Sequence, residues 1–276
     1  MVKRRILIPL LAVLVLGSGC GKKPEPETLP DIMTARPTVY KDQSVASAAM
    51  NRTVRYSVWL PPTYDETKTY PVLFLLHGAE TDYPAWNVFD ATNAHRAWLD
   101  KGNLSTIATR YVQGGGELFI IATPNGCPDG QNVFYADGDQ YKYGTFFLDE
   151  FIPHVESKYH GNGKRAIAGL SMGGFGTLYH CLLNPGKWTY AYAMSPACWW
   201  MDDMVKQSDP SKLPGITLEM GMDDTTVTPE SVEQFHQLLV SQGVEHEYIT
   251  RSGGHTWTFW QECLPKALKK VGESFK

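Results

Sequence analysis

Cysteine is scarce in this chain of 276 residues, and the positions of its five cysteines exclude a structural zinc site of the usual kind. No two of them have the paired spacing that such sites require. Four lie beyond Cys20, namely Cys127, Cys181, Cys198 and Cys263, and an even number permits disulfides in an exported protein. The sequence favours no pairing, and Cys181 falls in a predicted buried helix, where a free thiol packs as a small apolar group.

Basic clusters are also absent beyond the first residues, and the formal net charge is −4. We therefore expect no nucleic-acid partner, because such a protein needs a basic face. The chain has no internal repeat. Its 43% apolar and 20% charged residues are ordinary for a globular protein. Its length suits one α/β domain or two small ones, with room for a large core.

The N-terminus has the pattern of an export signal. Three basic residues precede Ile6–Leu16, an apolar run of signal-peptide length that is too short to span a membrane comfortably. The following stretch, Leu16-Gly-Ser-Gly-Cys20, resembles a bacterial lipobox, in which the signal is cut before a cysteine that carries the lipid. Gly17 stands where leucine is usual, and a plain secretory signal with an unmodified Cys20 is the alternative.

These features divide the chain into three parts. We expect a signal peptide over residues 1–19, a lipidated Cys20 at the head of a Pro-rich tether over 20–44, and one folded domain over 45–276. An exported lipoprotein would lie at the periplasmic or cell-surface face of a membrane, held there by its lipid.

Strands and helices alternate through the predicted domain. Continuous apolar runs such as 72–76 indicate strands that are buried on both faces. The predicted strands cover 53–60, 72–76, 118–122, 165–168, 190–195, 216–220 and 247–250, and the predicted helices cover 90–113, 146–159, 177–183, 228–242 and 257–274. This alternation predicts an α/β fold with a largely parallel sheet and helices on both of its faces.

One turn between a strand and a helix carries the strongest motif. The stretch Gly169-Leu-Ser171-Met-Gly173 has the G-x-S-x-G pattern of a nucleophile elbow. A strand that turns sharply into a helix holds the serine in a strained backbone conformation, with its hydroxyl clear of the sheet edge. Glycines two residues to either side let the chain pass without Cβ clashes. The alternative is a Gly-rich turn that only feeds a helix.

A serine nucleophile needs a base, and four histidines follow Ser171 along the chain. His180 falls on the helix after the elbow and is expected to be a core or surface helix residue. His236 and His246 are expected at ordinary surface positions. His255 follows the last predicted strand and precedes a helix, so it lies on a loop at the same sheet edge as Ser171. We therefore predict that His255 is the general base.

The base in turn needs an orienting carboxylate, which in an α/β-hydrolase follows the serine and precedes the histidine. Asp223 and Asp224 lie together after the predicted strand 216–220. Neighbouring side chains in an extended loop point apart, so only one of them can face His255. The residues themselves leave the choice open, with the other acid either solvated or capping the loop.

The negative charge that develops on the oxygen of the attacked carbonyl group needs two backbone N–H groups to stabilise it. One is expected from Met172, the residue after the nucleophile. The other is expected from Ala79, because His77-Gly78-Ala79 ends the buried run 72–76 and Gly78 lets the chain turn inward.

Four stretches together carry a resemblance to a known family: Tyr70-Pro-Val-Leu-Phe-Leu-Leu-His-Gly78, Ala166-Ile-Ala-Gly-Leu-Ser-Met-Gly-Gly174, Gly221-Met-Asp-Asp224 and Gly253-Gly-His-Thr-Trp257. Over residues 45–274 the chain resembles the Putative esterase (esterase D-like) family of α/β-hydrolases, which includes the feruloyl and acetylxylan esterases of carbohydrate esterase family 1. The resemblance implies an α/β-hydrolase fold and ester hydrolysis without a cofactor. It also implies an acid three residues after the glycine of the third stretch, which favours Asp224 over Asp223.

Aromatic residues gather on the loops that are expected to rim the site. Taken singly, each could be a core or scaffold residue. Together they indicate a groove that stacks on a sugar ring or an aromatic acyl group, with Trp199 and Trp200 the strongest candidates because they follow a strand end. The predicted substrate contacts are Trp86, Tyr135, Trp199, Trp200 and Trp257, and the same loops hold Phe134, Tyr141 and Tyr143.

The sequence therefore predicts a serine esterase that removes feruloyl or acetyl groups from plant cell-wall polysaccharide or its oligosaccharides. A siderophore or other small-molecule esterase, or an acyltransferase resembling the mycolyltransferases, would use the same site. A formylglutathione thioesterase has similar motifs, but its substrate is cytosolic and the export signal argues against it. A non-catalytic glycan-binding lipoprotein on a hydrolase scaffold is the alternative from another class.

Overall fold

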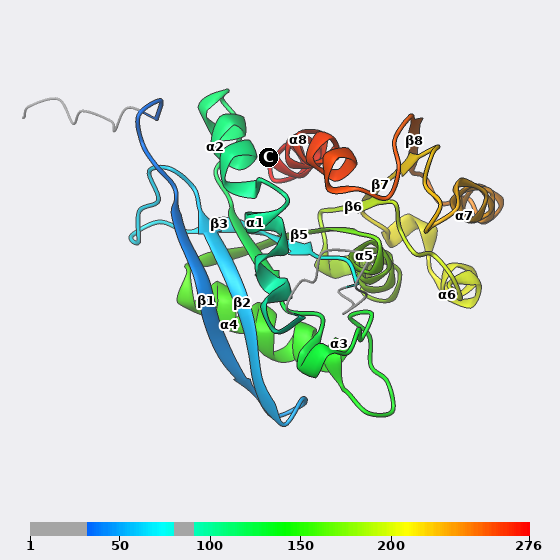
Figure 1. The fold of residues 1–276 in the computed structure, drawn as a ribbon, viewed down its shortest axis with the longest axis horizontal. Coiled ribbons are helices and arrows are strands. Elements are labelled where there is room, and N and C mark those ends of the chain that lie inside the picture. Colours follow the sequence, from blue (N-terminus) through cyan, green and yellow to red (C-terminus); the bar gives the residue numbers. More distant parts are fainter. Residues whose placement is uncertain (1–31, 80–90) are drawn as a thin grey trace, which may run out of the picture. The chain divides into compact units, whose positions relative to one another are not determined.

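The computed structural model describes residues 32–79 and 91–276, which are built on an eight-stranded sheet (Figure 1). The strand order is β1-β2-β4-β3-β5-β6-β7-β8. β1 and β2 are antiparallel, β2 and β4 are antiparallel, and every later pair is parallel. The strands are β1 Thr38–Ser47, β2 Arg52–Leu60, β3 Tyr70–Leu76, β4 Ile120–Pro124, β5 Gly161–Leu170, β6 Tyr190–Met194, β7 Gly215–Gly221 and β8 Glu247–Arg251.

Helices follow most of the parallel strands, as the alternation predicted. The longer ones are α2 Leu104–Gln113, α4 Ile152–Lys158, α5 Met172–Leu183, α6 Asp202–Gln207, α7 Pro229–Ser241 and α8 Trp257–Ser274. The short helical segments are η2 Ala91–Arg96, α1 Ala97–Asp100, η3 Pro128–Gly130, α3 Tyr143–Thr145, η4 Phe146–Phe151, η5 Pro185–Lys187 and η6 Pro210–Lys212. The predicted α/β-hydrolase fold is therefore confirmed.

Alternation along each central strand divides the core into two layers. On β3, Val72, Phe74 and Leu76 pack into one apolar cluster, whereas Leu73 and Leu75 pack into the other. All five are fully buried, because successive side chains of a strand point to opposite faces and helices cover both. This explains why the run reads as continuously apolar in the sequence.

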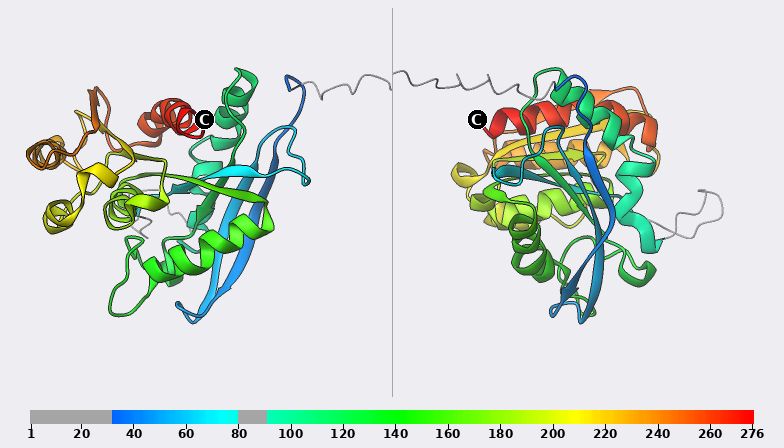
Figure 2. Two further views of the ribbon diagram at one scale, coloured as in Figure 1. Left: turned by 180° about the vertical axis from the view of Figure 1, so that it is seen from behind. Right: turned by 90° about the vertical axis from the view of Figure 1, so that its left-hand side faces the viewer.

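Each layer has its own helices. Residues of α2 and α8 join the cluster that contains Leu73, and residues of α4, α5 and α7 join the cluster that contains Phe74. In Figure 2, α2 and α8 lie on one side of the central strands, and α4 and α5 lie on the other side. The loops at the carboxyl ends of β3, β5, β6, β7 and β8 meet along one edge of the sheet, and the candidate functional residues lie there.

The predicted boundary between tether and domain at residue 45 is wrong. β1 begins at Thr38 and pairs with β2 along its length, with a register shift between Tyr40 and Gln43. This edge strand carries the polar sequence TVYKDQSVAS, and most of its residues are exposed or half-buried. Because only one neighbour covers it, the strand lacks the apolar run that identified β3.

Two predicted helices are interrupted. The helix expected over 90–113 is split between α1 and α2 at Gly102 and Asn103, where Asn103 has a φ of 51°. The helix expected over 146–159 begins earlier, at Tyr143, and passes through a π-helical turn over Phe146–Phe151 before α4. Pro153 lacks an N–H group, so the chain cannot close a regular turn there.

Within the part of the chain that the structure describes, no helix is both long and apolar enough to cross a membrane. The cysteines at 127, 181, 198 and 263 are all buried. Burial raises the pKa of Cys198 to about 12, mainly by desolvating the thiolate. The fully buried Cys181 therefore packs as a small apolar group, as expected.

Candidate active site

Ser171 occupies the sharp turn between β5 and α5. Its φ of 53° and ψ of −116° lie in a region that non-glycine residues rarely adopt. A Cβ on Gly169 would overlap the carbonyl oxygen of Gly173, and a Cβ on Gly173 would lie 2.5 Å from the carbonyl oxygen of Leu76. Both glycines of the motif are thus required by close backbone packing, and the turn has the strained geometry expected of a nucleophile elbow.

The structure brings Ser171 together with His255 and Asp224, which come from the loops after β8 and β7. His255 Nε2 lies 3.0 Å from Ser171 Oγ, and His255 Nδ1 lies 2.7 Å from Asp224 Oδ2. The Asp224 side chain is fully buried and that of His255 is 9% exposed. The carboxylate therefore accepts the Nδ1 proton, which leaves Nε2 free to accept a proton from the serine.

The second oxygen of Asp224 is held as firmly as the first. Asp224 Oδ1 accepts hydrogen bonds from the backbone N–H groups of Thr226 and Val227, both at 2.9 Å. These bonds fix the carboxylate plane toward His255. Asp223 points elsewhere, to Ser252 and Gly253, so Asp224 is the acid of the pair that faces the histidine.

The loop after β3 lies against the serine. A Cβ on Gly78 would be 3.4 Å from Ser171 Cβ and 2.6 Å from the Leu170 Cδ1 methyl group, so the loop backbone lies close to the elbow. Ala79 follows at an exposed position. Its backbone N–H is the one that the sequence predicts to be an oxyanion donor.

His77 sets the orientation of this loop. Its Nε2 accepts the Gly126 N–H at 2.8 Å, so Nδ1 carries the proton and donates to the Gly78 carbonyl oxygen at 2.7 Å. The Gly78–Ala79 peptide is trans, which directs the Ala79 N–H away from the carbonyl that His77 holds. Burial lowers the pKa of His77 to about 4, so the ring stays neutral. Sequence reasoning treated His77 only as part of the loop.

Tryptophan side chains pack against the histidine and against one another. Trp260 on α8 packs edge-on against the His255 ring, with centroids 4.9 Å apart, and its Nε1 donates to Ser195 Oγ at 3.3 Å. Trp257 packs against Trp260 and Trp98 and is half-buried. No sequence pattern identified Trp260, because it lies within an apolar helix face like any core residue.

The aromatic residues predicted to contact substrate have different positions. Trp199 is 38% exposed and Trp200 is 79% exposed, at the carboxyl end of β6. Tyr135 is fully buried, and its hydroxyl donates to the His77 carbonyl oxygen at 3.0 Å. The prediction of a substrate contact from Tyr135 is therefore wrong, since the ring has no accessible surface. Trp86 lies outside the described residues.

The sequence also made predictions for Cys20 and for the three other histidines that follow Ser171. Cys20 lies outside the described residues. His180 is buried in the core and donates from Nε2 to the Tyr135 carbonyl oxygen at 2.9 Å. His236 and His246 are half-buried, and their ring nitrogens pair at 2.7 Å, so they are less exposed than expected. Over residues 32–79 and 91–276, no group of three or more histidine, cysteine or acidic side chains could hold a metal ion.

A serine on a strained turn, with a histidine and a buried carboxylate in line behind it, is the arrangement of α/β-hydrolases that use a serine nucleophile. Sequence comparison agrees with the fold and this geometry. Residues 47–271 match the family model described as Putative esterase. The chain belongs to the Putative esterase family, and the protein is a carboxylic ester hydrolase.

Solved structures with the same fold include several esterases. A ferulic acid esterase is 28% identical, with a TM-score of 0.76 over 88% of this chain and 100% of that one. A ferulic acid esterase from Anaeromyces mucronatus, in complex with ferulic acid, is 19% identical, with a TM-score of 0.66 over 87% and 92%. The S-formylglutathione hydrolase of Staphylococcus aureus is 16% identical, with a TM-score of 0.65 over 86% and 99%.

Proposed function

We propose that the protein cleaves its ester through an acyl-enzyme on Ser171. The observation that carries this proposal is the line of contacts from Asp224 through His255 to Ser171, at 2.7 and 3.0 Å. His255 Nε2 accepts the Oγ proton as Oγ forms a bond to the ester carbonyl carbon. The resulting imidazolium is stabilised by Asp224, and its proton then passes to the departing alcohol oxygen as the C–O bond breaks.

Two backbone N–H groups stabilise the tetrahedral intermediate in this mechanism. Met172 is the first residue of α5, so its N–H has no partner within the helix and lies at the positive end of the helix dipole. Ala79 supplies the second N–H from the loop that His77 orients. Water activated by His255 then attacks the acyl-enzyme and releases the acid.

We infer that the substrate is a feruloyl or acetyl ester of plant cell-wall polysaccharide or its oligosaccharides. Two observations support this. The relative at 28% identity is a ferulic acid esterase. The exposed side chains of Trp199 and Trp200 follow the end of β6, the strand beside the one that ends at Ser171, and they offer a surface for a sugar or a phenolic ring.

A substrate panel with an active-site variant tests the proposal. The panel contains methyl ferulate, acetylated xylan, p-nitrophenyl acetate and S-formylglutathione. We expect hydrolysis of the oxygen esters, and we expect Ser171→Ala to lower kcat by about 10⁴-fold or more with an unchanged circular dichroism spectrum. An active Ser171→Ala enzyme would exclude the mechanism. A preference for S-formylglutathione over every oxygen ester would replace the proposed substrate class.

The same proposal includes location. We propose export by the N-terminal signal and lipid attachment at Cys20, so that the enzyme works at the periplasmic or cell-surface side of a membrane and meets substrate outside the cytoplasm. Mass spectrometry of the mature N-terminus tests this, with Cys20→Ser as the matched control. A mature protein that begins elsewhere and carries no lipid would leave the esterase proposal intact and remove the anchor.

A further inference from the structure

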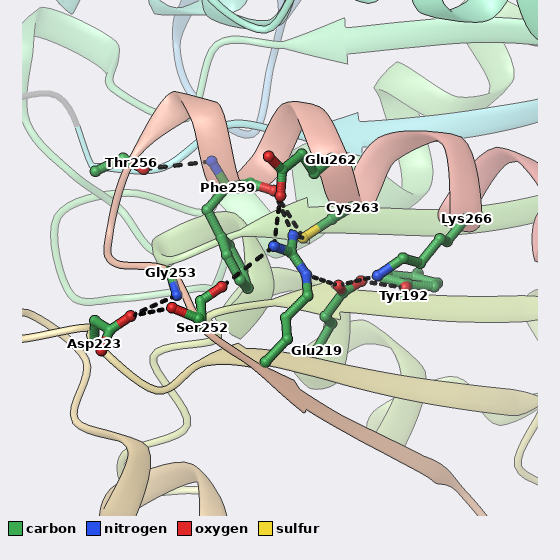
Figure 3. Close-up of polar contacts among 11 residues, drawn as sticks. Tyr192, Glu219, Asp223, Ser252, Gly253, Thr256, Phe259, Glu262, Cys263 and Lys266 are labelled. Carbon is green, nitrogen blue, oxygen red and sulfur yellow. Dashed lines mark hydrogen bonds and ion pairs between the residues drawn. The ribbon is translucent and has the colours of Figure 1, made fainter.

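The second acid of the Asp223–Asp224 pair bonds to the loop that carries His255. Asp223 Oδ2 accepts hydrogen bonds from Ser252 Oγ and from the Gly253 N–H, both at 2.8 Å (Figure 3). The Asp223 N–H in turn donates to the Gly253 carbonyl oxygen at 2.9 Å. Three bonds therefore join one residue after β7 to two adjacent residues after β8.

The two loops are in direct backbone contact at this point. A Cβ on Gly221 would overlap the Gly253 carbonyl oxygen, and Gly253 itself has a φ of 139°, which is open mainly to glycine. A glycine in such a conformation has many alternative states in a free loop. The bonds from Asp223 select the one conformation that is compatible with the observed position of His255 two residues later.

The start of this loop is fixed by a second group of contacts. Arg251, the last residue of β8, donates from Nε to Glu219 Oε1 at 2.7 Å, and its other nitrogens reach Glu262 at 2.7 Å and the Phe259 carbonyl oxygen at 2.9 Å (Figure 3). The buried Glu219 also accepts from Lys266 at 2.6 Å. β7, β8 and α8 are thus tied together below the loop, and Asp223 adds the hydrogen bonds that hold Ser252 and Gly253 from the side of β7.

We propose that Asp223 is a positioning residue for the general base: by holding Ser252 and Gly253 it keeps His255 Nε2 within hydrogen-bond reach of Ser171 Oγ. This inference rests on the proposed function of Ser171, His255 and Asp224. The adjacent acids then have different tasks. Asp224 orients the imidazole ring directly, whereas Asp223 orients the backbone that carries the ring.

The charge of Asp223 suits this task. The Ser252 hydroxyl, followed by the Gly253 N–H, holds the pKa of this carboxyl below its usual value, so it is ionised and a strong acceptor throughout the neutral range. The side chain is exposed, and its hydrogen bonds go to Ser252 and Gly253, whereas the imidazole bonds to Asp224. Its influence on the reaction therefore passes through the loop.

Kinetics of four variants test the inference: Asp223→Ala, Asp223→Asn, Ser252→Ala and the double variant Asp223→Ala/Ser252→Ala. Asp203→Ala, which removes an exposed aspartate on α6, is the matched control. The measurements are kcat and KM for p-nitrophenyl acetate and the second-order rate of Ser171 labelling by a fluorophosphonate, all well below the unfolding temperature.

We expect Asp223→Ala to lower kcat and the labelling rate by about 10- to 100-fold with KM within about twofold, because a small displacement of a base has that effect. Asp223→Asn keeps one acceptor oxygen and should lose less. The losses from Asp223→Ala and Ser252→Ala should not add in the double variant, because both remove the same bond. Asp203→Ala should behave as wild type.

Two results would overturn the inference. One is an Asp223→Ala enzyme with wild-type kcat and labelling rate, which would leave Asp223 a structural residue only. The other is full additivity of the Asp223 and Ser252 losses, which would mean that they act separately. Neither result affects the proposed function, which stands or falls with Ser171→Ala.

Discussion

At the scale of single residues, the Ala79 N–H is the oxyanion donor that we propose for the loop after β3. Ala79→Pro removes this N–H without altering a side chain that contacts Ser171. We expect kcat to fall by about 10²- to 10³-fold, because one of two oxyanion donors is lost, while KM changes little. Steady-state kinetics on p-nitrophenyl acetate measure both parameters.

Ala79→Gly is the matched control, since it keeps the N–H and should retain most of the activity. Thermal unfolding of both variants shows whether the loop alone has changed. An Ala79→Pro enzyme with near wild-type kcat would remove Ala79 from the oxyanion site and leave Met172 to be paired with another donor.

Chain order was enough to bring Ser171 and His255 together, because each follows a parallel strand and such strands end at one edge of the sheet. The choice between Asp223 and Asp224 could not be made from their own pattern, since they are neighbours with the same chemistry. Tyr135 shows a further limit. An aromatic residue in a polar loop reads the same in sequence whether its ring turns outward or, as here, packs inside against Gly126 and Gly176.

At the scale of elements, the elbow depends on how closely β3, β5 and α5 approach. Gly173→Ala would place a methyl group against the backbone carbonyls of Leu76 and His77, neither of which can move without breaking the sheet edge. We expect Gly173→Ala to destabilise the protein by about 2 kcal/mol or more and to lower the yield of soluble enzyme. Urea unfolding followed by tryptophan fluorescence measures the change.

Gly186 provides the control for this prediction. A Cβ there meets no atom within 4 Å, and its φ is not positive, so Gly186→Ala should leave the unfolding midpoint almost unchanged. Equal midpoints for the two variants would show that the backbone at Gly173 has more freedom than the structure indicates.

Elements with a clear apolar run or apolar periodicity were predicted well, and the polar edge strand β1 was missed. β3, β4 and β5 have apolar runs because both layers pack on them. β1 has one neighbour and a polar sequence, so nothing in its composition separates it from the tether before it. The helix before β5 was predicted from the spacing of its apolar residues. Its π-helical turn arises because Pro153 lacks an N–H group, and the apolar spacing does not reveal this.

At the scale of the whole molecule, histidines other than the base are mostly held neutral by burial. Desolvation lowers the pKa of His77 and of His180 to about 4, and it also lowers the pKa values of His95, His154 and His246. His180 shows why burial lowers the pKa of these histidines. Its Nε2 donates to a backbone oxygen, and its Nδ1 is buried with no hydrogen-bond partner in the described part of the chain, so a second proton there would have no acceptor.

These shifts predict how the stability of the whole domain depends on pH. A histidine whose pKa is 6.5 in the unfolded chain and about 4 in the folded protein binds its proton more readily when unfolded. Its contribution to stability is therefore complete above pH 6.5 and is lost as the pH falls toward 4. Each of His77 and His180 should account for about 3 kcal/mol of this loss, since one pKa unit corresponds to about 1.4 kcal/mol.

His180→Gln separates this effect from carboxylate titration, because Gln keeps an N–H donor for the Tyr135 carbonyl oxygen and does not ionise in this range. The measurement is the free energy of unfolding in urea between pH 7 and pH 4.5, for wild type and variant. The variant should lose less stability over this interval than wild type, whatever its stability at pH 7, because carboxylates contribute equally to both. Parallel curves would mean that His180 takes up its proton in the folded protein, and that the closed packing around it opens at mildly acidic pH.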